Sequence, residues 1–489
     1  MLRKSKLFPA AGAVLLASCG GGGGGGGGNP GPVNQAPTIT SAGTATVAEN
    51  ATGTAYQATA TDPDGNSVTF ALGGTDAARF TITGSGVLSF VAPPDFEAPA
   101  DAGANNVYDL ILIASDGSLT SQIALTVTVT NQPDTAVVRR IAAGYDQPQH
   151  IVGVPGGNNL FVAEKDGRIY LLDTAQQGQG KGVLFMTVGN IGTFPSNSAG
   201  YGLFSVAPAS DYATSGRFYV AVSDPGGVIE IRRYNRAGAT AGDPASGNVI
   251  LRIPTIVRSG TQVAAELVFG ADGMLYIFTG EGGDRGAPQR LSDLRGKVLR
   301  IDVTQDAFPA DPDRDYAIPA SNPNLGGVVN EVYAYGLYDP RGASFNGADL
   351  LFGEHEIFED GEINLLRPQD KGANYGFPFG QRTPPPGATP PVILVTPQMF
   401  ATGGYVYRGS VLPLRGIYLY GHGRLGIFGV PASQLVQGTT LQGGTARAEL
   451  NPPGVDPPAI RSFAEDSQGE LYYVTGPTLT GDVFKIEAR

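Results

Sequence analysis

The sequence predicts an all-β protein in which an N-terminal β-sandwich is followed by a six-bladed β-propeller. The chain of 489 residues contains 72 Gly and 37 Pro but only 16% charged residues, a composition typical of turn-rich chains rather than helical bundles. Residues 36–134 alternate β-branched with small or polar residues, and over residues 135–489 a paired-strand pattern recurs six times. The length exceeds what one hydrophobic core supports, so at least two folded units are expected.

Residues 1–19 have the pattern of an export signal that ends in a lipobox. A basic start precedes a short apolar stretch, which ends in Leu16-Ala17-Ser18-Cys19 and contains the only cysteine of the chain at its end. The stretch is too short to span a bilayer, and no later stretch reaches the roughly 18 apolar residues that a membrane helix needs. We therefore expect a protein anchored in the bacterial cell envelope by a lipid on Cys19. The alternative is a free thiol in a disordered leader.

Residues 20–35 are expected to form a flexible tether. Gly20 begins an unbroken glycine run, and a Pro-rich segment follows, so this part cannot bury enough apolar surface to become ordered. A linker of this kind reaches roughly 20–25 Å, which holds a domain clear of the lipid headgroups. By resemblance to bacterial sorting rules, Gly20 rather than an aspartate after the cysteine favours the outer membrane.

The charge of the chain disfavours nucleic acid as a partner. The formal net charge is −12, and it becomes −15 when the leader is removed with Arg3, Lys4 and Lys6. Affinity for a phosphate backbone comes largely from basic patches, which such a chain is poorly placed to supply. A small neutral molecule such as a sugar, or a lipid membrane reached through Cys19, is compatible with this charge.

Carboxylates lie at the ends of the predicted strands of the sandwich. They are Glu49, Asp62, Asp64, Asp95, Glu97 and Asp116. Oxygen ligands grouped in loops suit calcium. The alternative is that these carboxylates only cap turns.

The segment also resembles a single cadherin repeat over about 95 residues. The segments "ATDPDGNSVTFAL", "FTITGSGVLSF" and "YDLILIASDG" carry this resemblance. It implies two calcium half-sites, one with Glu49, Asp95 and Glu97 and the other with Asp62, Asp64 and Asp116. In that family a neighbouring repeat completes each half-site. Here residues 130–134 read Thr-Asn-Gln-Pro-Asp, without the usual alternation of Asp and Asn, and no second repeat follows.

Beyond Thr135 each repeat consists of an apolar-aromatic-apolar strand followed by a second strand. Self-similarity at a spacing of some tens of residues is typical of propeller blades. The first strands begin at Leu160, Phe218, Leu275, Leu350, Tyr418 and Leu471, and the second strands include those at Arg168, Ile229, Lys297, Glu362, Leu425 and Asp482.

Motifs within these repeats resemble the glucose/sorbosone dehydrogenases, whose members use pyrroloquinoline quinone and calcium to oxidise sugars. The segments are "LVFGADGMLYIFTGEGG", "LSDLRGKVLRID", "EVYAYGL", "GEINLL", "KGANYGFP" and "GGYVYRGSVLP". The resemblance extends over residues 136–489. It implies a general base that takes the hydroxyl proton, cations that hold the carboxylates of the quinone, and a metal that polarises its carbonyl.

Two positions depart from the family pattern. The resemblance places a histidine base where this chain has Gln262, and an amide cannot accept a proton near neutral pH. Losing such a base costs on the order of 10²- to 10⁴-fold in rate. The usual Arg-Asn is replaced by Tyr338 and Asp339, which should lower the affinity for an anion because Arg provides a bidentate clamp and Asp repels it.

Other positions agree with the family. Arg408 matches a basic residue that faces the cofactor, Arg424 is a second candidate, and Glu281 replaces an aspartate while keeping its charge. The resemblance assigns the calcium of the cofactor to main-chain carbonyls at Glu356 and Ile357. It also suggests a separate structural calcium at Glu362 and Tyr375, although Gly361 stands where an aspartate is usual.

The chain has three histidines, all in the propeller: His150, His355 and His422. His150 opens the first blade and is the best surrogate for the missing base, whereas His355 matches a position with a structural role. The alternative for each is a histidine that is hydrogen-bonded at the end of a strand.

Two functions remain open on the sequence. The first is a quinoprotein that oxidises a sugar or polyol in the cell envelope. The second is a propeller without its base that binds a carbohydrate or protein ligand, with the sandwich helping to hold it at the envelope or serving only as a spacer. Fold similarity by itself does not decide between them.

Overall fold

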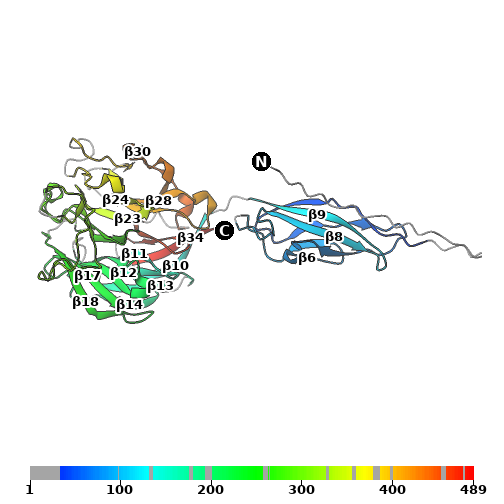
Figure 1. The fold of residues 1–489 in the computed structure, drawn as a ribbon, viewed down its shortest axis with the longest axis horizontal. Helices are drawn as coiled ribbons and strands as arrows, with labels where there is room; N and C mark the ends of the chain where they lie inside the picture. The colour runs from blue at the N-terminus through cyan, green and yellow to red at the C-terminus, as the bar shows by residue number, and fades with distance from the viewer. Residues whose placement is uncertain are drawn as a thin grey trace, which may run out of the picture. The chain divides into compact units, whose positions relative to one another are not determined.

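The computed structural model describes residues 33–489, except 97, 132–135, 176–179, 193–200, 257–262, 264, 327–329, 355–359, 378–385, 397–399, 424, 453–458, 477–479 and 489. The chain divides into two compact units, residues 1–132 and 133–489, and nearly all of the regular elements that the structure describes in them are strands (Figure 1). Within the described part, no helix is both long and apolar enough to cross a membrane. The expected leader and most of the expected tether lie outside the described residues.

The first unit is a β-sandwich of two main sheets, with strand orders β2-β9-β8-β5 and β3-β7-β6, and a small pair β1-β4. Alternate residues of β8 point into its core, where Tyr108 packs edge-on against Phe80 and Phe90. The strands are β1 (Thr38–Ile39), β2 (Thr44–Ala48), β3 (Thr54–Gln57), β4 (Ala60–Thr61), β5 (Thr69–Gly73), β6 (Phe80–Ile82), β7 (Val87–Phe90), β8 (Val107–Ser115) and β9 (Thr120–Thr130).

The second unit contains six sheets, each a predicted blade, which confirms the all-β fold class with its propeller. The first three blades are β11 (Pro148–Val154), β12 (Asn159–Glu164), β13 (Arg168–Asp173) and β14 (Val183–Thr187); β15 (Leu203–Pro208), β16 (Arg217–Ser223), β17 (Ile229–Arg236) and β18 (Gly242–Ile253); and β19 (Ala265–Phe269), β20 (Leu275–Thr279), β21 (Lys297–Ile301) and β22 (Val332–Tyr335).

The remaining blades are less regular. The fourth has β23 (Pro340–Asn346), β24 (Asp349–Glu354), β25 (Gly361–Leu366), β26 (Ile393–Val395) and β30 (Leu441–Gln442); the fifth has β27 (Ala401–Val406), β28 (Ile417–His422), β29 (Ile427–Pro431) and β31 (Thr445–Ala446); the sixth has β32 (Ile460–Glu465), β33 (Leu471–Thr475), β34 (Thr480–Ala488) and β10 (Ala136–Asp146). The described helices are α1 (Tyr212–Ser215) and six short 3-10 turns.

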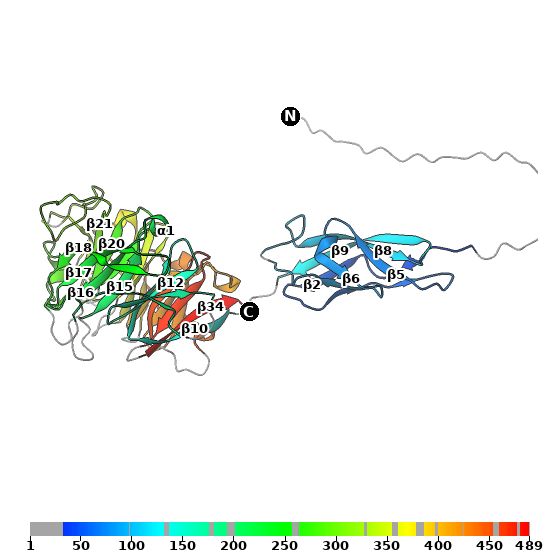
Figure 2. The same ribbon diagram turned by 90° about the horizontal axis from the view of Figure 1, so that it is seen from below.

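The sixth blade joins the two ends of the propeller. Strand β10 from the start of the unit pairs with β34 from its end, with Ala136 opposite Ala488 (Figure 2). The pairing gives β34 a partner on its outer edge, so the last strands of the chain are not left as an open edge. The ring is therefore closed by hydrogen bonds between distant parts of the sequence.

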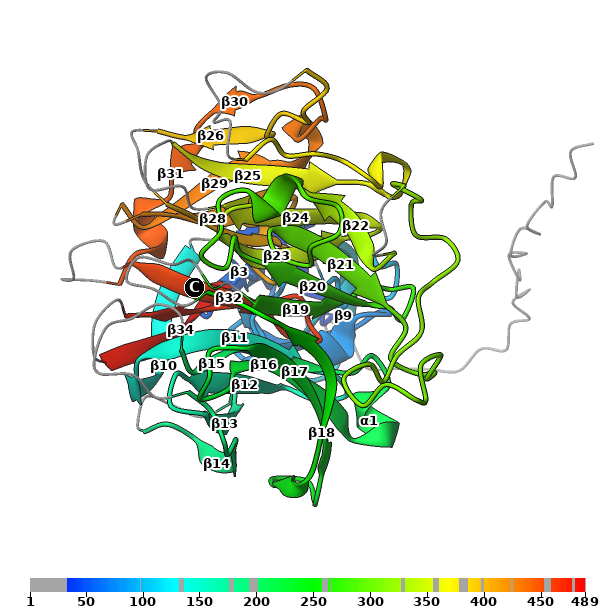
Figure 3. The ribbon, with the colours of Figure 1, turned by 90° about the vertical axis from the view of Figure 1, so that its left-hand side faces the viewer.

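The repeat seen in the sequence marks the middle of each blade rather than its inner edge. The predicted first strands lie in β12, β16, β20, β24, β28 and β33, which are the second strands of their sheets. The inner strands are β11, β15, β19, β23, β27 and β32, and Figure 3 shows most of them gathered around the centre of the propeller.

A polar side chain connects each inner strand to the main chain of the next. These bonds run from His150 to Val206 N, Ser205 to Ala265 O, Glu266 to Gly342 N and Ala343 N, Ser344 to Gly404 O, Thr402 to Ile460 O, and Ser462 to Ile151 O. Because main-chain groups buried away from water need partners, this belt of bonds stabilises the centre of the ring.

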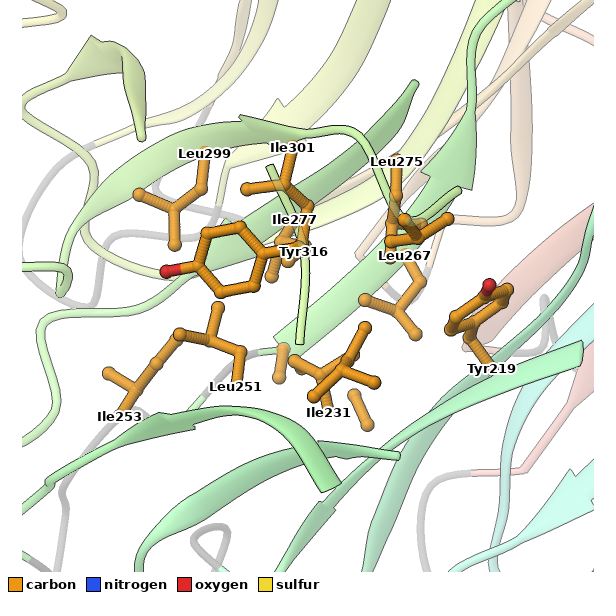
Figure 4. Close-up of a cluster of buried hydrophobic side chains, with 14 of the residues drawn as sticks. Tyr219, Ile231, Leu251, Ile253, Leu267, Leu275, Ile277, Leu299, Ile301 and Tyr316 are labelled. Carbon is orange, nitrogen blue, oxygen red and sulfur yellow. The ribbon is translucent and has the colours of Figure 1, made fainter. Parts of the chain in front are cut away.

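The blades pack on one another through apolar faces. Figure 4 shows Ile231 and Leu251 of the second blade facing Leu267 and Ile277 of the third, and all four side chains are buried. Truncating such a residue, as in Ile277→Ala, typically costs about 2–5 kcal/mol of stability. This packing between blades holds the loops at the two ends of the propeller in fixed positions.

Candidate functional site

The six inner strands begin at one face of the propeller and end at the other. Corresponding positions of neighbouring inner strands meet: Gly342 of β23 lies against Gly403 of β27, and Asn346 at the end of β23 bonds Arg408 just beyond the end of β27. We call the face where these strands begin the entry face and the face where they end the exit face. Tyr338 and Asp339, which depart from the family pattern, directly precede β23 and therefore lie at the entry face.

Tyr338 is fixed at the entry face by its main chain and by its ring. Its carbonyl accepts a hydrogen bond from the N–H of Glu281 at 2.9 Å, and its own N–H donates to the Glu354 carboxylate. The ring packs 4.7 Å from that of Phe377, and the Arg285 guanidinium lies over it at 6.0 Å. The structure thus brings the predicted residues Tyr338 and Glu281 together, with the phenol buried.

Asp339 forms a buried ion pair with a residue that the sequence reasoning missed. Its Oδ2 accepts hydrogen bonds from Nε and Nη2 of Arg341 at 3.0 and 2.8 Å. Asp339 is fully buried, whereas the Arg341 side chain is 32% exposed. Residues two apart on a strand project to the same side, so the Asp-Pro-Arg sequence was the available signal.

Arg461 is a second guanidinium near this ion pair. It stands at the second position of β32, and its Nη2 donates to Oε1 of Gln149 in β11. Burial, followed by the charge of Arg341, lowers the pKa of Arg461 to about 10, so it stays cationic at neutral pH. Within the described part of the chain it forms no ion pair with a carboxylate.

Glu266 is the carboxylate nearest in sequence to the predicted base position. Its two oxygens accept the N–H groups of Gly342 and Ala343, each at 2.6 Å. Burial raises the pKa of Glu266 to about 7. Gln262 lies outside the described residues, and so do Arg424, Glu356, Ile357 and His355.

The two described histidines are both buried and bonded to the main chain. His150 Nδ1 accepts the N–H of Val206 at 3.5 Å, and burial lowers the pKa of His150 to about 4. His422 Nε2 lies 3.0 Å from the Thr396 carbonyl, and its ring stacks on Phe428. These contacts correspond to the structural alternative for both histidines.

Arg408 does not join Tyr338 and Asp339. It lies beyond the end of β27 at the exit face, where it donates to Glu465 at 2.9 Å and to Asn346 at 2.8 Å. Asp339 directly precedes the seven residues of β23, and Asn346 ends them. At about 3.3 Å per residue, the two groups are separated by roughly 20 Å.

A cavity of about 190 Å³ beside Tyr338 contains the residues of the suggested structural calcium site. It is lined by Glu354, Asp360, Glu362 and Tyr375, among others. The amide of Asn364 donates to Glu354 at 3.3 Å and Glu362 at 3.2 Å, and its Oδ1 is buried with no hydrogen-bond partner in the part of the chain that the structure describes. The oxygen-rich lining suits a hard cation. Among the described residues, however, no three His, Cys, Asp or Glu side chains converge as a metal site.

The described residues of the entry face do not fit a polycarboxylate cofactor well. Such a cofactor needs an excess of cations. Arg341 is paired with Asp339, which leaves Arg461, Lys165 near it and Arg285 over the Tyr338 ring as the other cations that the structure describes in this region. Asp339 adds a buried negative charge beside the position of the lost guanidinium. The arrangement therefore offers a polyanion less positive charge than the Arg-Asn of the family pattern would offer.

The carboxylates of the sandwich gather at opposite ends of β8. At one end, Asn34 donates to Asp116 at 2.8 Å and the N–H of Gln35 donates to Asp64 at 2.7 Å, while Oδ2 of Asp62 is buried and has no hydrogen-bond partner among the described residues. At the other end, Glu49 accepts the N–H of Phe96 at 3.0 Å.

Near that second end, Asp95 accepts the N–H of Ala98, whereas Glu97 lies outside the described residues. The first end thus has a buried carboxylate oxygen that a cation would satisfy, and the second shows carboxylates that cap turns.

Known proteins resemble more than two thirds of this chain. Hedgehog-interacting protein of Mus musculus is 25% identical over 384 residues, which cover 71% of this chain and 52% of that protein, so the chain spans about half the length of this relative. The apo-form of the soluble aldose sugar dehydrogenase of Escherichia coli has a TM-score of 0.55 and 21% identity, with 73% of this chain and 100% of that chain covered.

The PQQ-bound aldose sugar dehydrogenase of Streptomyces coelicolor gives a similar result, with a TM-score of 0.56, 22% identity, and coverage of 73% of this chain and 99% of that chain. At this level of identity the two structures establish the fold alone. A profile of the family described as Glucose / Sorbosone dehydrogenase matches residues 145–476, more than half of the chain. The motifs, the six blades and this match together show that the chain belongs to the glucose/sorbosone dehydrogenase family.

Proposed function

We propose that this protein is a ligand-binding propeller of the cell envelope, which keeps the fold of the sugar dehydrogenases but has lost their quinone chemistry. The observation that carries the proposal is the buried pair of Asp339 and Arg341, because it neutralises a cation at the entry face. Gln262 stands where the family resemblance implies the histidine base, so the general base is a second part of the quinone chemistry that this chain lacks. The ligand we expect at the entry face is a sugar or polyol.

One of the similar proteins, which is named for an interaction, supports the proposed binding function. Hedgehog-interacting protein is named for binding another protein, and its similarity covers 71% of this chain. A propeller of this family can therefore serve in a binding protein, and a protein partner at the entry face is the second form that the proposal can take.

A quinoprotein that oxidises a sugar or polyol, with calcium and pyrroloquinoline quinone, is the alternative. Membership in the family and the cationic Arg461 favour it. The base would then have to be another group, and Glu266 and His150 both bond main-chain N–H groups instead.

Aldose oxidation by the purified protein and by a repaired variant separates the two functions. Wild type, given the quinone, calcium and an artificial electron acceptor, should show no turnover above background. The triple change Gln262→His, Tyr338→Arg and Asp339→Asn should raise turnover by about 10²-fold or more, the size of a typical general-base contribution. Robust wild-type turnover would refute the binding function.

We further propose that the protein is attached to the envelope through a lipid on Cys19, in the outer membrane. The spacing of the basic start, the apolar stretch and the cysteine supports this attachment. Cys19→Ser should leave the chain unprocessed and without acyl groups, as seen by mass spectrometry. An acylated, membrane-bound Cys19→Ser protein would show that the thiol is not the attachment site.

A further inference from the structure

A second cavity, of about 310 Å³, opens between the third and fourth blades near the exit face. Its main side chains come from the turn after β19, from β20, β21, β22 and β23, and from the segment after β25. They are Asp272, Tyr276, Arg300, Tyr333, Phe345 and Lys371. The turn after β19 and the end of β23 belong to the exit face, so this cavity is separate from Tyr338 and Asp339.

Three aromatic rings form one wall of the cavity. Tyr276 meets Tyr333 edge-on, with ring centroids 5.5 Å apart and an interplanar angle of 87°, and it meets Phe345 at 5.2 Å and 72°. The guanidinium of Arg300 lies over Tyr276 and Tyr333, at 5.7 and 5.4 Å from their centroids. The rings fix one another, so the wall is preformed and needs little ordering on binding.

Arg300 and Asp272 supply the polar groups beside this wall. Asp272 Oδ2 accepts Nε and Nη2 of Arg300 at 3.1 and 2.8 Å and the Tyr276 hydroxyl at 3.0 Å. Arg300 Nη1 also donates to Ser321 and Asn322, at 3.0 and 2.8 Å. The guanidinium has five N–H groups, and these bonds hold it in one orientation with one N–H left over.

Lys371 has more hydrogen-bond donors left for a ligand than Arg300, the other cation of the cavity. It is exposed, its Nζ donates to the Ser321 carbonyl at 2.8 Å, and it makes no ion pair with any residue that the structure describes. An ammonium group has three N–H donors, so two remain for a ligand. Two cations thus stand beside one carboxylate, in a chain whose formal net charge is −12.

We propose that this cavity binds a saccharide that carries a carboxylate, such as a uronic acid unit. Phe345, the partly exposed ring of the wall, can pack against the C–H face of a sugar ring, and Asp272 can accept hydrogen bonds from ring hydroxyls. Lys371 and the remaining N–H of Arg300 match the carboxylate in charge and in donor type. The volume lies at the lower end of small-molecule pockets, which suits one or two sugar units.

Calorimetric titration of the purified full-length chain with glucuronate and with glucose tests this site. Glucuronate should bind at least roughly tenfold more tightly than glucose, because only glucuronate makes charge-assisted bonds. Lys371→Ala should weaken glucuronate by roughly tenfold and leave glucose nearly unchanged, whereas Lys371→Arg should keep most of the affinity. Arg140→Ala removes an exposed cation from the sixth blade and should have no effect.

Several results would overturn the assignment. Equal affinities for glucose and glucuronate would remove the role of the carboxylate, and unchanged glucuronate affinity in Lys371→Ala would move the site elsewhere. Competition by inorganic phosphate as strong as that by glucuronate would indicate a simple anion site. The inference does not rest on the proposed function: changes at Asp339 should leave this binding intact, and sugar oxidation at the entry face would not alter it.

Discussion

Asp339 Oδ2 accepts two hydrogen bonds from the guanidinium of Arg341, two residues further along the chain. Asp339 stands where the family resemblance implies Asn, next to Tyr338 in the place of the implied Arg, and its carboxylate neutralises Arg341 where an anion would otherwise bind. Because the carboxylate is fully buried, the pair is also part of what holds β23 at the entry face.

Breaking this pair should destabilise the propeller. Asp339→Asn leaves the Arg341 guanidinium without its carboxylate, close to Arg461, and should lower the free energy of unfolding by about 1–3 kcal/mol, less than for a fully buried pair because Arg341 is partly exposed. Urea denaturation of Asp339→Asn, Arg341→Gln and the double variant measures the coupling. Strictly additive losses would mean that the two side chains do not depend on each other.

The pKa of Glu266 gives a dependence of stability on pH that can be tested. Burial raises this pKa from 4.5 to about 7, so between these values the folded protein binds a proton that the unfolded chain does not. The stabilisation of the fold by this bound proton is fully present below pH 4.5 and is lost as the pH rises through 7. Relative to Glu266→Gln, wild type should lose about 1–3 kcal/mol between pH 5 and 8. If the free energies of unfolding of wild type and Glu266→Gln changed in parallel with pH, the raised pKa of Glu266 would be contradicted.

His150 should have the opposite effect. Burial lowers its pKa from 6.5 to about 4, so its neutral form stabilises the fold above pH 6.5, and this stability is lost as the pH falls toward 4. His150→Asn keeps an acceptor for the Val206 N–H and removes the titration. Wild type should lose about 1–3 kcal/mol relative to this variant between pH 7 and 4. A wild type that loses no more stability than His150→Asn on acidification would show that the imidazole is accessible to protons in the fold.

The sequence predicted the blades well and their inner edges poorly. Most second and third strands of the blades are buried on both faces, and their apolar-aromatic runs, such as those at Leu160 and Leu471, are apparent in the sequence. The inner strands carry polar residues such as Glu266 and Thr402, which bond to the neighbouring blade. Their mixed pattern does not repeat regularly, because the side chain at the junction varies among His, Ser, Glu and Thr.

The candidate site was predicted only in part, for two physical reasons. Motif matching identified Tyr338, Asp339 and Glu281, which lie together, but it assigned Arg408 to the same site although the length of β27 carries it to the exit face. It also missed Arg341 and Arg461, because they come from different blades and only the closed ring brings their charges near each other.

Calcium should stabilise the sandwich at the end that contains Asp62. Its buried Oδ2 has no hydrogen-bond partner among the described residues, and the carboxylates of Asp64 and Asp116 lie in the same loop cluster. Addition of calcium should therefore raise the melting temperature of the sandwich unit, and a chelator should reverse this. In Asp62→Asn the shift should disappear, whereas in Asp95→Asn at the opposite end it should remain. No shift in wild type would show that these carboxylates only cap turns.

The central claim is that the entry face of this propeller no longer holds the quinone of its family. Calorimetric titration of wild type with pyrroloquinoline quinone in the presence of calcium tests it most directly. The paired Asp339 and Arg341 predict no saturable binding below about 100 µM, and tighter binding in Asp339→Asn, where the guanidinium is released. One-to-one binding to wild type at about 1 µM or below, with aldose-dependent reduction of the bound quinone, would contradict the account.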